Sequence, residues 1–170
     1  MSSFFQRVAG APISWGVCEV PGWGLELPVD RVLSEMQELG LAATELGSDG
    51  YLPSDPCELR EACARYDLEM IGGFVPVVLH DPAQREASLA AAERAAALMG
   101  GAGGHLFITS MVTSFDWAPR LEIDAAAWDY AAAMLDEIEE IVAAHGMSQA
   151  IHPHLGTMIE RPSDVKNVLE

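Results

Sequence analysis

Lysine is almost absent from this sequence, and positive charge is scarce altogether. Lys166 is the one lysine, and lysine plus arginine number 9 against 26 aspartates and glutamates. Schiff-base catalysis therefore has no good candidate, since Lys166 falls in an expected surface helix. The formal net charge of −17 argues against nucleic acid as a partner, because such a chain repels phosphate backbones. A divalent metal could reverse the local sign at one site, so anionic small molecules stay possible.

Cysteine is also sparse, with three residues at Cys18, Cys57 and Cys63. Their odd number and the lack of C-x-x-C spacing argue against a disulfide framework and a zinc knuckle, and favour a reduced cytosolic setting. No run reaches the roughly 18 apolar residues of a membrane helix. The start, MSSFFQRVAGAP, lacks the apolar core of a signal peptide. We therefore expect a soluble cytoplasmic protein that has no membrane partner.

Several catalytic signatures are missing as well. The sequence has no G-x-S-x-G nucleophile turn and no G-K-[ST] phosphate loop. The glycine-rich stretch GGAGGH, residues 100–105, precedes a strand-like run and lacks the G-x-G-x-x-G order of dinucleotide sites. We interpret it as a helix stop followed by a tight turn.

Short apolar runs alternate with longer helical patterns along the chain. Strands are expected at 12–17, 42–47, 68–79, 105–110 and 148–154. Helices are expected from Val29 to Gly40, from the Asp55-Pro56 cap onward, over 84–99, over 124–145, and from Pro162.

This alternation predicts an α/β fold in which helices cover a parallel sheet. A doubly wound sheet and a (β/α)8 TIM barrel both fit the pattern. A barrel usually needs about 250 residues, so this chain would hold only about the first five βα units. No linker divides residues 1–170, which predicts a single, partial barrel domain whose C-terminal strands are absent.

The segment IHPHLGTMIE, residues 151–160, contains the most suggestive polar pattern. In a strand, His152 and His154 would point to the same face, and at the carboxyl end of a barrel strand they would reach the mouth. Neutral imidazoles bind borderline metals such as Mn²⁺, Co²⁺ or Zn²⁺. The alternative is that His152 is a hydrogen-bonded interior residue and His154 a solvated loop residue.

Three further residues follow expected strands. Glu45 ends the second strand, where a carboxylate could act as a base, bind a substrate hydroxyl or coordinate a metal, or else cap a turn or pair with an arginine. Trp15 would close the first strand and could stack on a sugar, although core packing is the more common role of an indole. His80 follows the third strand and stays undecided. His105, at the opposite end of its strand, and His145, at a helix end, are interpreted as structural.

The runs PISWGV, TELGSDGYLP and HPHLGT together resemble the sugar phosphate isomerase/epimerase family, which has the xylose isomerase-like TIM barrel. The similarity covers nearly the whole chain, in the right order. Within that family the chain is most similar to the inosose-dehydratase-like branch, whose fifth strand carries an HHHxGT motif. Pro153 replaces the middle histidine of that motif.

The resemblance implies a divalent metal that assists removal of the proton next to a sugar carbonyl. It implies His152 and His154 as metal ligands, Glu45 as a catalytic residue, and Trp15, Glu45, His80 and His154 as residues that bind substrate. The substrate would be a small sugar, a sugar phosphate or an inositol derivative.

The same resemblance implies that the metal's ligand set is incomplete here, because the family takes further ligands from later strands. We therefore expect a fragment of a longer enzyme, a truncated product, or a chain completed by another subunit in a homo-oligomer. The alternative is a non-catalytic carbohydrate-binding or interaction protein derived from the same barrel. A related DNA-repair endonuclease would share the fold, but the charge argues against it.

Overall fold

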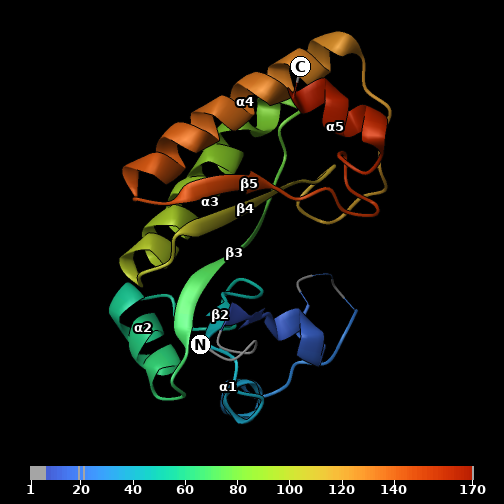
Figure 1. Cartoon of the computed structure of the whole chain (residues 1–170). Coiled ribbons are helices and arrows are strands. Elements are labelled where there is room, and N and C mark those ends of the chain that lie inside the picture. The colour runs from blue at the N-terminus through green and yellow to red at the C-terminus, as the bar shows by residue number, and fades with distance from the viewer. Residues whose placement is uncertain (1–6, 19, 21, 170) are drawn as a thin grey trace. The chain divides into compact units, whose positions relative to one another are not determined.

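The computed structural model describes residues 7–18, 20 and 22–169. The chain divides into two compact units, which are described separately. The first runs to Phe74 and includes Ala97–Leu106, and the second comprises Val75–Ala96 and the chain from Phe107 onward. The strands follow one another in the order β1-β2-β3-β4-β5 (Figure 1). This order of parallel strands with intervening helices is that of a partial TIM barrel and confirms the predicted fold class.

The first unit contains the first βα repeats. Its elements are β1 (Ala9–Gly10), a 3-10 helix (Pro12–Trp15), α1 (Val29–Glu38), β2 (Ala43–Glu45), α2 (Pro56–Ala64) and the first part of β3 (Glu69–Val77). The pairs β1–β2 and β2–β3 are both parallel. The unit therefore consists of βαβ repeats with parallel strands, as a barrel requires.

The expectation of a strand at 12–17 is wrong. Pro12 begins a 3-10 helix that ends where Gly16 adopts a left-handed conformation, φ 89°. Proline lacks an N–H and has a φ suited to a first helical turn, so it favours this turn over a sheet ladder. The strand lies just before it, at Ala9–Gly10, and Trp15 ends a helical turn instead of a strand.

The first two helices agree with the sequence pattern. Val32, Leu33 and Met36 are fully buried along α1, and Gly40 follows the helix with φ 73°. Asp55 caps α2 by accepting hydrogen bonds from the backbone N–H groups of Cys57 and Glu58. The predicted cap and first-turn proline of α2 are thus confirmed.

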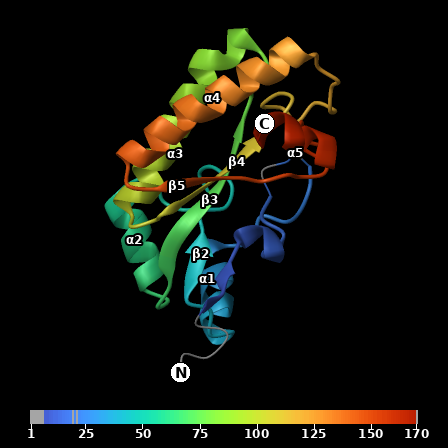
Figure 2. The same ribbon diagram turned by 45° about the horizontal axis from the view of Figure 1, so that its top comes forward.

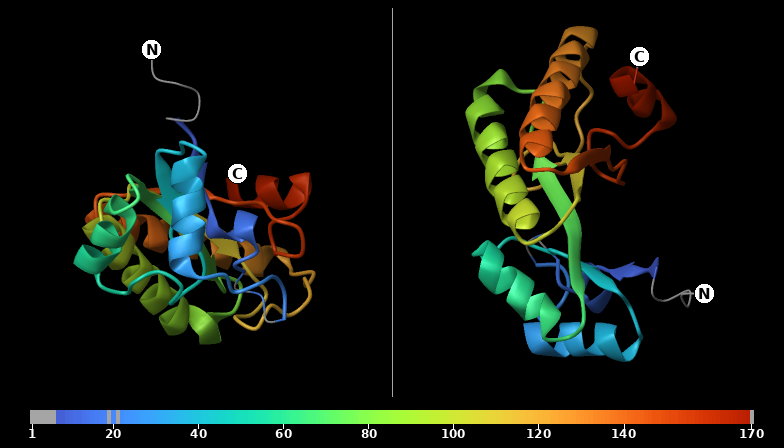
Figure 3. Two further views of the ribbon diagram at one scale, coloured as in Figure 1. Left: turned by 90° about the horizontal axis from the view of Figure 1, so that it is seen from below. Right: turned by 60° about the vertical axis from the view of Figure 1, so that its left-hand side comes forward.

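The second unit contains the remaining repeats. Its elements are the end of β3, a 3-10 helix (Pro82–Gln84), most of α3 (Arg85–Gly101), β4 (Leu106–Met111), α4 (Ala125–Ala144), β5 (Ser148–Ile151) and α5 (Pro162–Leu169). Helices α3 and α4 lie side by side (Figures 1 and 3). Their contact includes an ion pair between Arg85 and Glu137 and a 2.8 Å bond between His145 Nε2 and Glu93.

The core of the second unit packs the inner face of α4 against the strands. Met134, Ile138 and Val142 on α4, and Phe107 and Met111 on β4, have at most 1% of their surface exposed. Figure 2 shows β5 running beside β4. This packing places the carboxyl ends of β3, β4 and β5 at one edge of the unit, and the loops that follow them carry the candidate site.

Within the described part of the chain, no helix is long and apolar enough to cross a membrane. The prediction of a single domain over residues 1–170 stays a prediction.

Candidate functional site

His152 and His154 lie just beyond the end of β5. The strand ends at Ile151, so the expected strand over 148–154 is too long by its last residues. The structure nevertheless brings the two imidazoles together, with ring centroids 5.5 Å apart and the planes inclined by 31°. Both residues are exposed. Two exposed imidazoles at the carboxyl end of a strand can serve as neighbouring ligands of one cation.

The chemistry of His154 is set by its own backbone. Its Nδ1 lies 2.8 Å from the carbonyl oxygen of Leu155. A carbonyl oxygen can only accept, so Nδ1 carries the hydrogen and the lone pair of the neutral ring is on Nε2. This arrangement, in which one ring nitrogen donates to a carbonyl, is the usual one for a metal-binding histidine.

His152 is held by the sheet. Its backbone N–H donates to the carbonyl of Thr109 on β4 at 2.9 Å. Partial desolvation of the ring, and then the nearby His154, lower the pKa of His152 below the usual histidine value. A lowered pKa favours the neutral imidazole, which is the form that binds metal ions.

Glu45 ends β2 in the first unit, as the sequence predicted. The β2–β3 register shifts at this point: Thr44 is opposite Met70, whereas Glu45 is opposite Gly72. Such a bulge turns the side chain that follows it. Gly72 is required here, because a Cβ on it would lie 1.7 Å from the carbonyl oxygen of Leu106.

The Glu45 carboxyl group is half-buried. Burial raises its pKa above the usual glutamate value. Among the residues that the structure describes, no arginine pairs with it. A half-buried carboxylate with a raised pKa at the end of a barrel strand is a good candidate for a general base.

Trp15 is bound to α1 by its indole nitrogen. Nε1 donates to Oε2 of Glu35 at 2.7 Å, and Glu35 also accepts from Nε of Arg31 at 2.9 Å. The bonds from Arg31 and then Trp15 lower the pKa of Glu35. Because the N–H group is used, any contact of Trp15 with a sugar would involve its ring face.

His80 lies in the loop after β3, in the second unit. Its Nδ1 is buried and has no hydrogen-bond partner among the described residues. Burial lowers the pKa of His80, although Asp81 opposes the shift. The next residues are well anchored, since Asp81 caps the 3-10 helix by accepting from the N–H of Ala83. A neutral imidazole with a buried, unsatisfied nitrogen can accept a hydrogen bond from a ligand hydroxyl.

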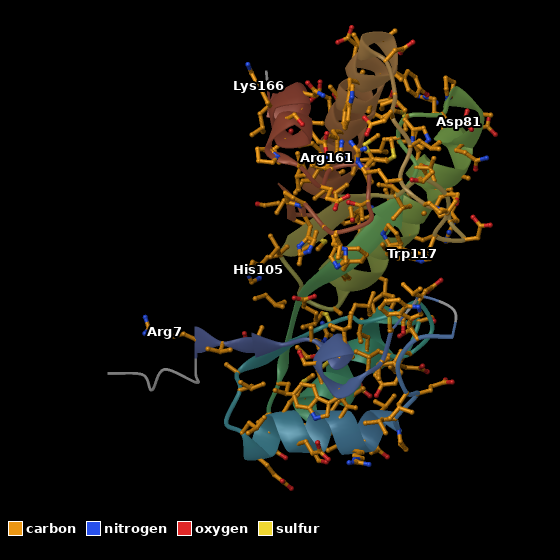
Figure 4. The ribbon with its side chains drawn as sticks, turned by 90° about the vertical axis from the view of Figure 1, so that its right-hand side faces the viewer. Arg7, Asp81, His105, Trp117, Arg161 and Lys166 are labelled. Atoms are coloured by element: carbon orange, nitrogen blue, oxygen red, sulfur yellow. The ribbon has the colours of Figure 1, made fainter. Side chains whose placement is uncertain are left out.

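Two features were missed by the sequence analysis. Trp117, in the loop after β4 (Figure 4), has φ 61°, an uncommon conformation for a bulky residue and one often found at functional sites. In the first unit, a pocket of about 450 Å³ is lined by Val17, Cys18 and residues within 22–26 on one side and by Ser48–Tyr51 on the other, and Trp23 is 75% exposed. The signal was present in each case as an aromatic residue in a loop.

A complete metal-binding cluster is not found within residues 7–18, 20 and 22–169: no group of three or more His, Cys, Asp or Glu side chains there could hold a metal ion. The chemistry of the His152–His154 pair fits two positions of a divalent cation's coordination shell. Structural and catalytic metals normally take at least three protein ligands. The two histidines alone therefore do not make up a complete metal site.

Sequence comparison identifies the family. The profile described as Xylose isomerase-like TIM barrel matches residues 33–170. The chain is 30% identical over 173 residues to an inosose dehydratase of Geobacillus kaustophilus, covering 96% of this chain and 56% of that protein. It is 28% identical over 174 residues to the rhizopine catabolism protein MocC of Rhizobium meliloti, covering 96% of this chain and 51% of that protein.

Solved structures agree on the fold. An L-ribulose 3-epimerase superposes with a TM-score of 0.68 at 14% identity, over 95% of this chain and 55% of the other. A xylose isomerase-like TIM barrel protein from Mycobacterium smegmatis, in complex with magnesium, superposes with a TM-score of 0.64 at 19% identity, over 99% of this chain and 62% of the other. The chain thus spans about half the length of the curated relatives it matches. It belongs to the xylose isomerase-like TIM barrel family.

Proposed function

We propose that this chain takes part in a metal-dependent isomerisation, epimerisation or dehydration of a small sugar, sugar phosphate or inositol derivative. The observation that carries the proposal is the His152–His154 pair, whose rings lie 5.5 Å apart beyond a barrel strand. The relatives are named for the dehydration of an inosose and the epimerisation of L-ribulose. Both reactions can begin with removal of a proton next to a carbonyl group, which unites them as one chemical class.

His152 and His154 would hold a divalent cation, Mn²⁺, Co²⁺ or Zn²⁺, as two of its ligands. When bound, such a cation polarises a substrate carbonyl and so makes the neighbouring C–H more acidic. The lowered pKa of His152 favours its neutral, metal-binding form, and the Nδ1 bond of His154 to the Leu155 carbonyl directs Nε2 of that ring away from the backbone acceptor. Further ligands would come from protein groups outside the described residues.

Glu45 is the proposed base. Its raised pKa makes it a stronger proton acceptor than an ordinary glutamate once it is ionised, and it follows a strand at the end where barrel enzymes place their sites. A proton can then be returned to the neighbouring carbon or to the opposite face of the same carbon, or a hydroxyl group can leave. These three fates give isomerisation, epimerisation and dehydration respectively.

His80 and Trp15 are proposed to bind the substrate, together with Glu45 and His154. The buried Nδ1 of His80 can accept a hydrogen bond from a sugar hydroxyl. Trp15 offers its ring face, because its N–H is bonded to Glu35. We also propose a cytoplasmic location, which the free thiols of Cys18, Cys57 and Cys63 favour, and assembly into a homo-oligomer.

The test is hydrogen exchange at the carbon next to a ketone. The protein, loaded with Mn²⁺, Co²⁺ or Zn²⁺, is incubated in D₂O with D-fructose or an inosose, and the loss of the C–H signal is followed by proton NMR. We expect metal-dependent exchange that Glu45→Gln abolishes and that Glu69→Gln, at the exposed amino end of β3, leaves unchanged. Lack of exchange with every metal and both ketones would contradict the proposal.

A non-catalytic carbohydrate-binding protein is the second candidate. It is favoured by the lack of a three-ligand metal cluster among the described residues. This candidate predicts that the same ketones bind in the presence of EDTA, and that Trp15→Ala weakens the binding. Calorimetric titration with and without EDTA separates the two functions.

A further inference from the structure

The HPHLGT segment is an excursion out of the β4–β5 ladder. His152 N–H donates to the Thr109 carbonyl at 2.9 Å. In a parallel ladder every second amide donates, so His154 should donate to Met111 next. Met158 does so instead, at 2.8 Å. Residues 154–157 therefore form a loop that leaves the ladder between two consecutive ladder hydrogen bonds, those of His152 and Met158.

One buried side chain closes this excursion. Thr157 is 1% exposed, whereas Leu155 at the tip is 81% exposed. The Thr157 hydroxyl lies 2.8 Å from the carbonyl oxygen of His154 and 3.2 Å from that of Ile159. Its backbone N–H also donates to the His154 carbonyl at 3.1 Å, and His154 N–H donates to Ile159 at 3.0 Å. The Thr157 hydroxyl thus links the two ends of the excursion.

The closure fixes the imidazole of His154. Holding the His154 carbonyl orients the peptide that leads to Leu155, and the carbonyl of Leu155 is the acceptor for His154 Nδ1 at 2.8 Å. The ring therefore depends on Thr157 through two successive hydrogen bonds. Groups of this kind, which orient a ligand without touching the ion, typically change metal affinity about 10- to 100-fold when they are removed.

We propose that Thr157 is a positioning residue: its hydroxyl holds His154 in the tautomer and orientation in which it can share a cation with His152. The part that concerns the cation rests on the proposed function. The part that concerns the ring does not, because the excursion and its hydrogen bonds are present in the protein alone.

The test compares Thr157→Val, which removes the hydroxyl at nearly equal volume, with Thr157→Ser, which keeps it. Thr113→Val is the matched control, because the Thr113 hydroxyl is also buried and contacts the same segment through Met158 Sδ at 3.2 Å. Two readouts are made on each protein. One is the tautomer of His154 by ¹⁵N NMR without metal, and the other is Co²⁺ affinity from visible absorption titration.

We expect the wild type, Thr157→Ser and Thr113→Val to show the Nδ1–H tautomer of His154. Thr157→Val should show a mixture of tautomers and bind Co²⁺ at least about 10-fold more weakly. An unchanged tautomer in a Thr157→Val protein that still melts cooperatively would overturn the proposal. If the wild type binds no Co²⁺, the proposed metal role fails, while the tautomer measurement still decides the role of Thr157.

Discussion

Arg120 and Asp164 form a buried ion pair across 44 residues of sequence, with Nη2 of Arg120 donating to Oδ1 of Asp164 at 3.0 Å. Their side chains are 10% and 5% exposed. The other carboxylate oxygen of Asp164 accepts from the backbone N–H groups of Glu160 and Arg161. The pair therefore ties the loop after β4 to the start of α5, next to the segment that carries the two histidines.

Removal of this carboxylate should be costly. Asp164→Ala leaves the Arg120 charge buried without its partner and removes the acceptor for two N–H groups, so we expect a loss of about 3 kcal/mol in the free energy of unfolding. Glu122→Ala is the control, because Glu122 also pairs with Arg120 but is 74% exposed. That change should cost much less, because water screens an ion pair with an exposed partner. Urea denaturation followed by circular dichroism measures both, and equal losses would contradict the account.

The Asp164 carboxyl group should also make the free energy of unfolding depend on pH in the acid range. Burial works against the charged form of Asp164, but the N–H groups of Arg161 and Glu160 and the charge of Arg120 outweigh it and lower the pKa. As the pH falls, the unfolded chain takes up this proton first, near pH 4, and the folded chain only at a lower pH. The contribution is therefore complete above about pH 4 and is lost below it.

Asp164→Asn isolates this contribution, since the amide cannot ionise. We expect the free energy of unfolding of the wild type to fall more steeply than that of Asp164→Asn between about pH 5 and pH 3. Urea titrations at several pH values give the two slopes. Parallel slopes would show that Asp164 has the same pKa in the folded and unfolded chains.

Ionisation of Glu45 should affect stability in the opposite direction to ionisation of Asp164. Burial raises its pKa, so the folded chain binds this proton more tightly than the unfolded chain, and ionisation at neutral pH reduces stability. We expect Glu45→Gln to be at least as stable as the wild type at pH 7, with the difference shrinking as the pH falls towards about 4 and constant below it. A less stable Glu45→Gln protein at pH 7 would assign Glu45 a structural role in place of the proposed chemical one.

Two fully buried serines in the second unit should respond differently to removal of the hydroxyl. Ser88 both accepts from the N–H of Val78, at 3.1 Å, and donates to its carbonyl, at 2.7 Å. The hydroxyl of Ser110 on β4 has no partner among the described residues. We expect Ser88→Ala to cost about 1–3 kcal/mol, and Ser110→Ala to be neutral or stabilising, in thermal and urea unfolding. A large loss for Ser110→Ala would mean that its hydroxyl has a partner in solution.

The local features of the fold could be predicted from the sequence. The Asp55-Pro56 cap, the buried face of α1 and the position of Glu45 at the end of β2 all depend on neighbours within a few residues. Hydrophobic periodicity and capping chemistry report such short-range relationships well. The family resemblance then supplied the barrel, which the matching profile confirms.

The errors and omissions have physical causes. Pro12 sits in an apolar run that looks like a strand, but it starts a helical turn. After His152 the chain leaves the β4–β5 ladder, and Met158 takes the ladder position that His154 would have filled. The residue pattern does not show this departure, so the sequence predicted a strand that is too long. The bond from Trp15 to Glu35 joins residues 20 apart, and no local pattern encodes it.

The central claim is that His152 and His154 are ligands of one divalent cation, and calorimetric titration with Mn²⁺ tests it most directly. The wild type, His152→Ala, His154→Ala and the control His105→Ala, which changes an exposed histidine before β4, are compared alongside their thermal melts. We predict binding to the wild type and to His105→Ala, and its loss in both other variants with little change in melting. Binding that survives in His152→Ala and His154→Ala, or that is lacking in a cooperatively melting wild type, would contradict the account.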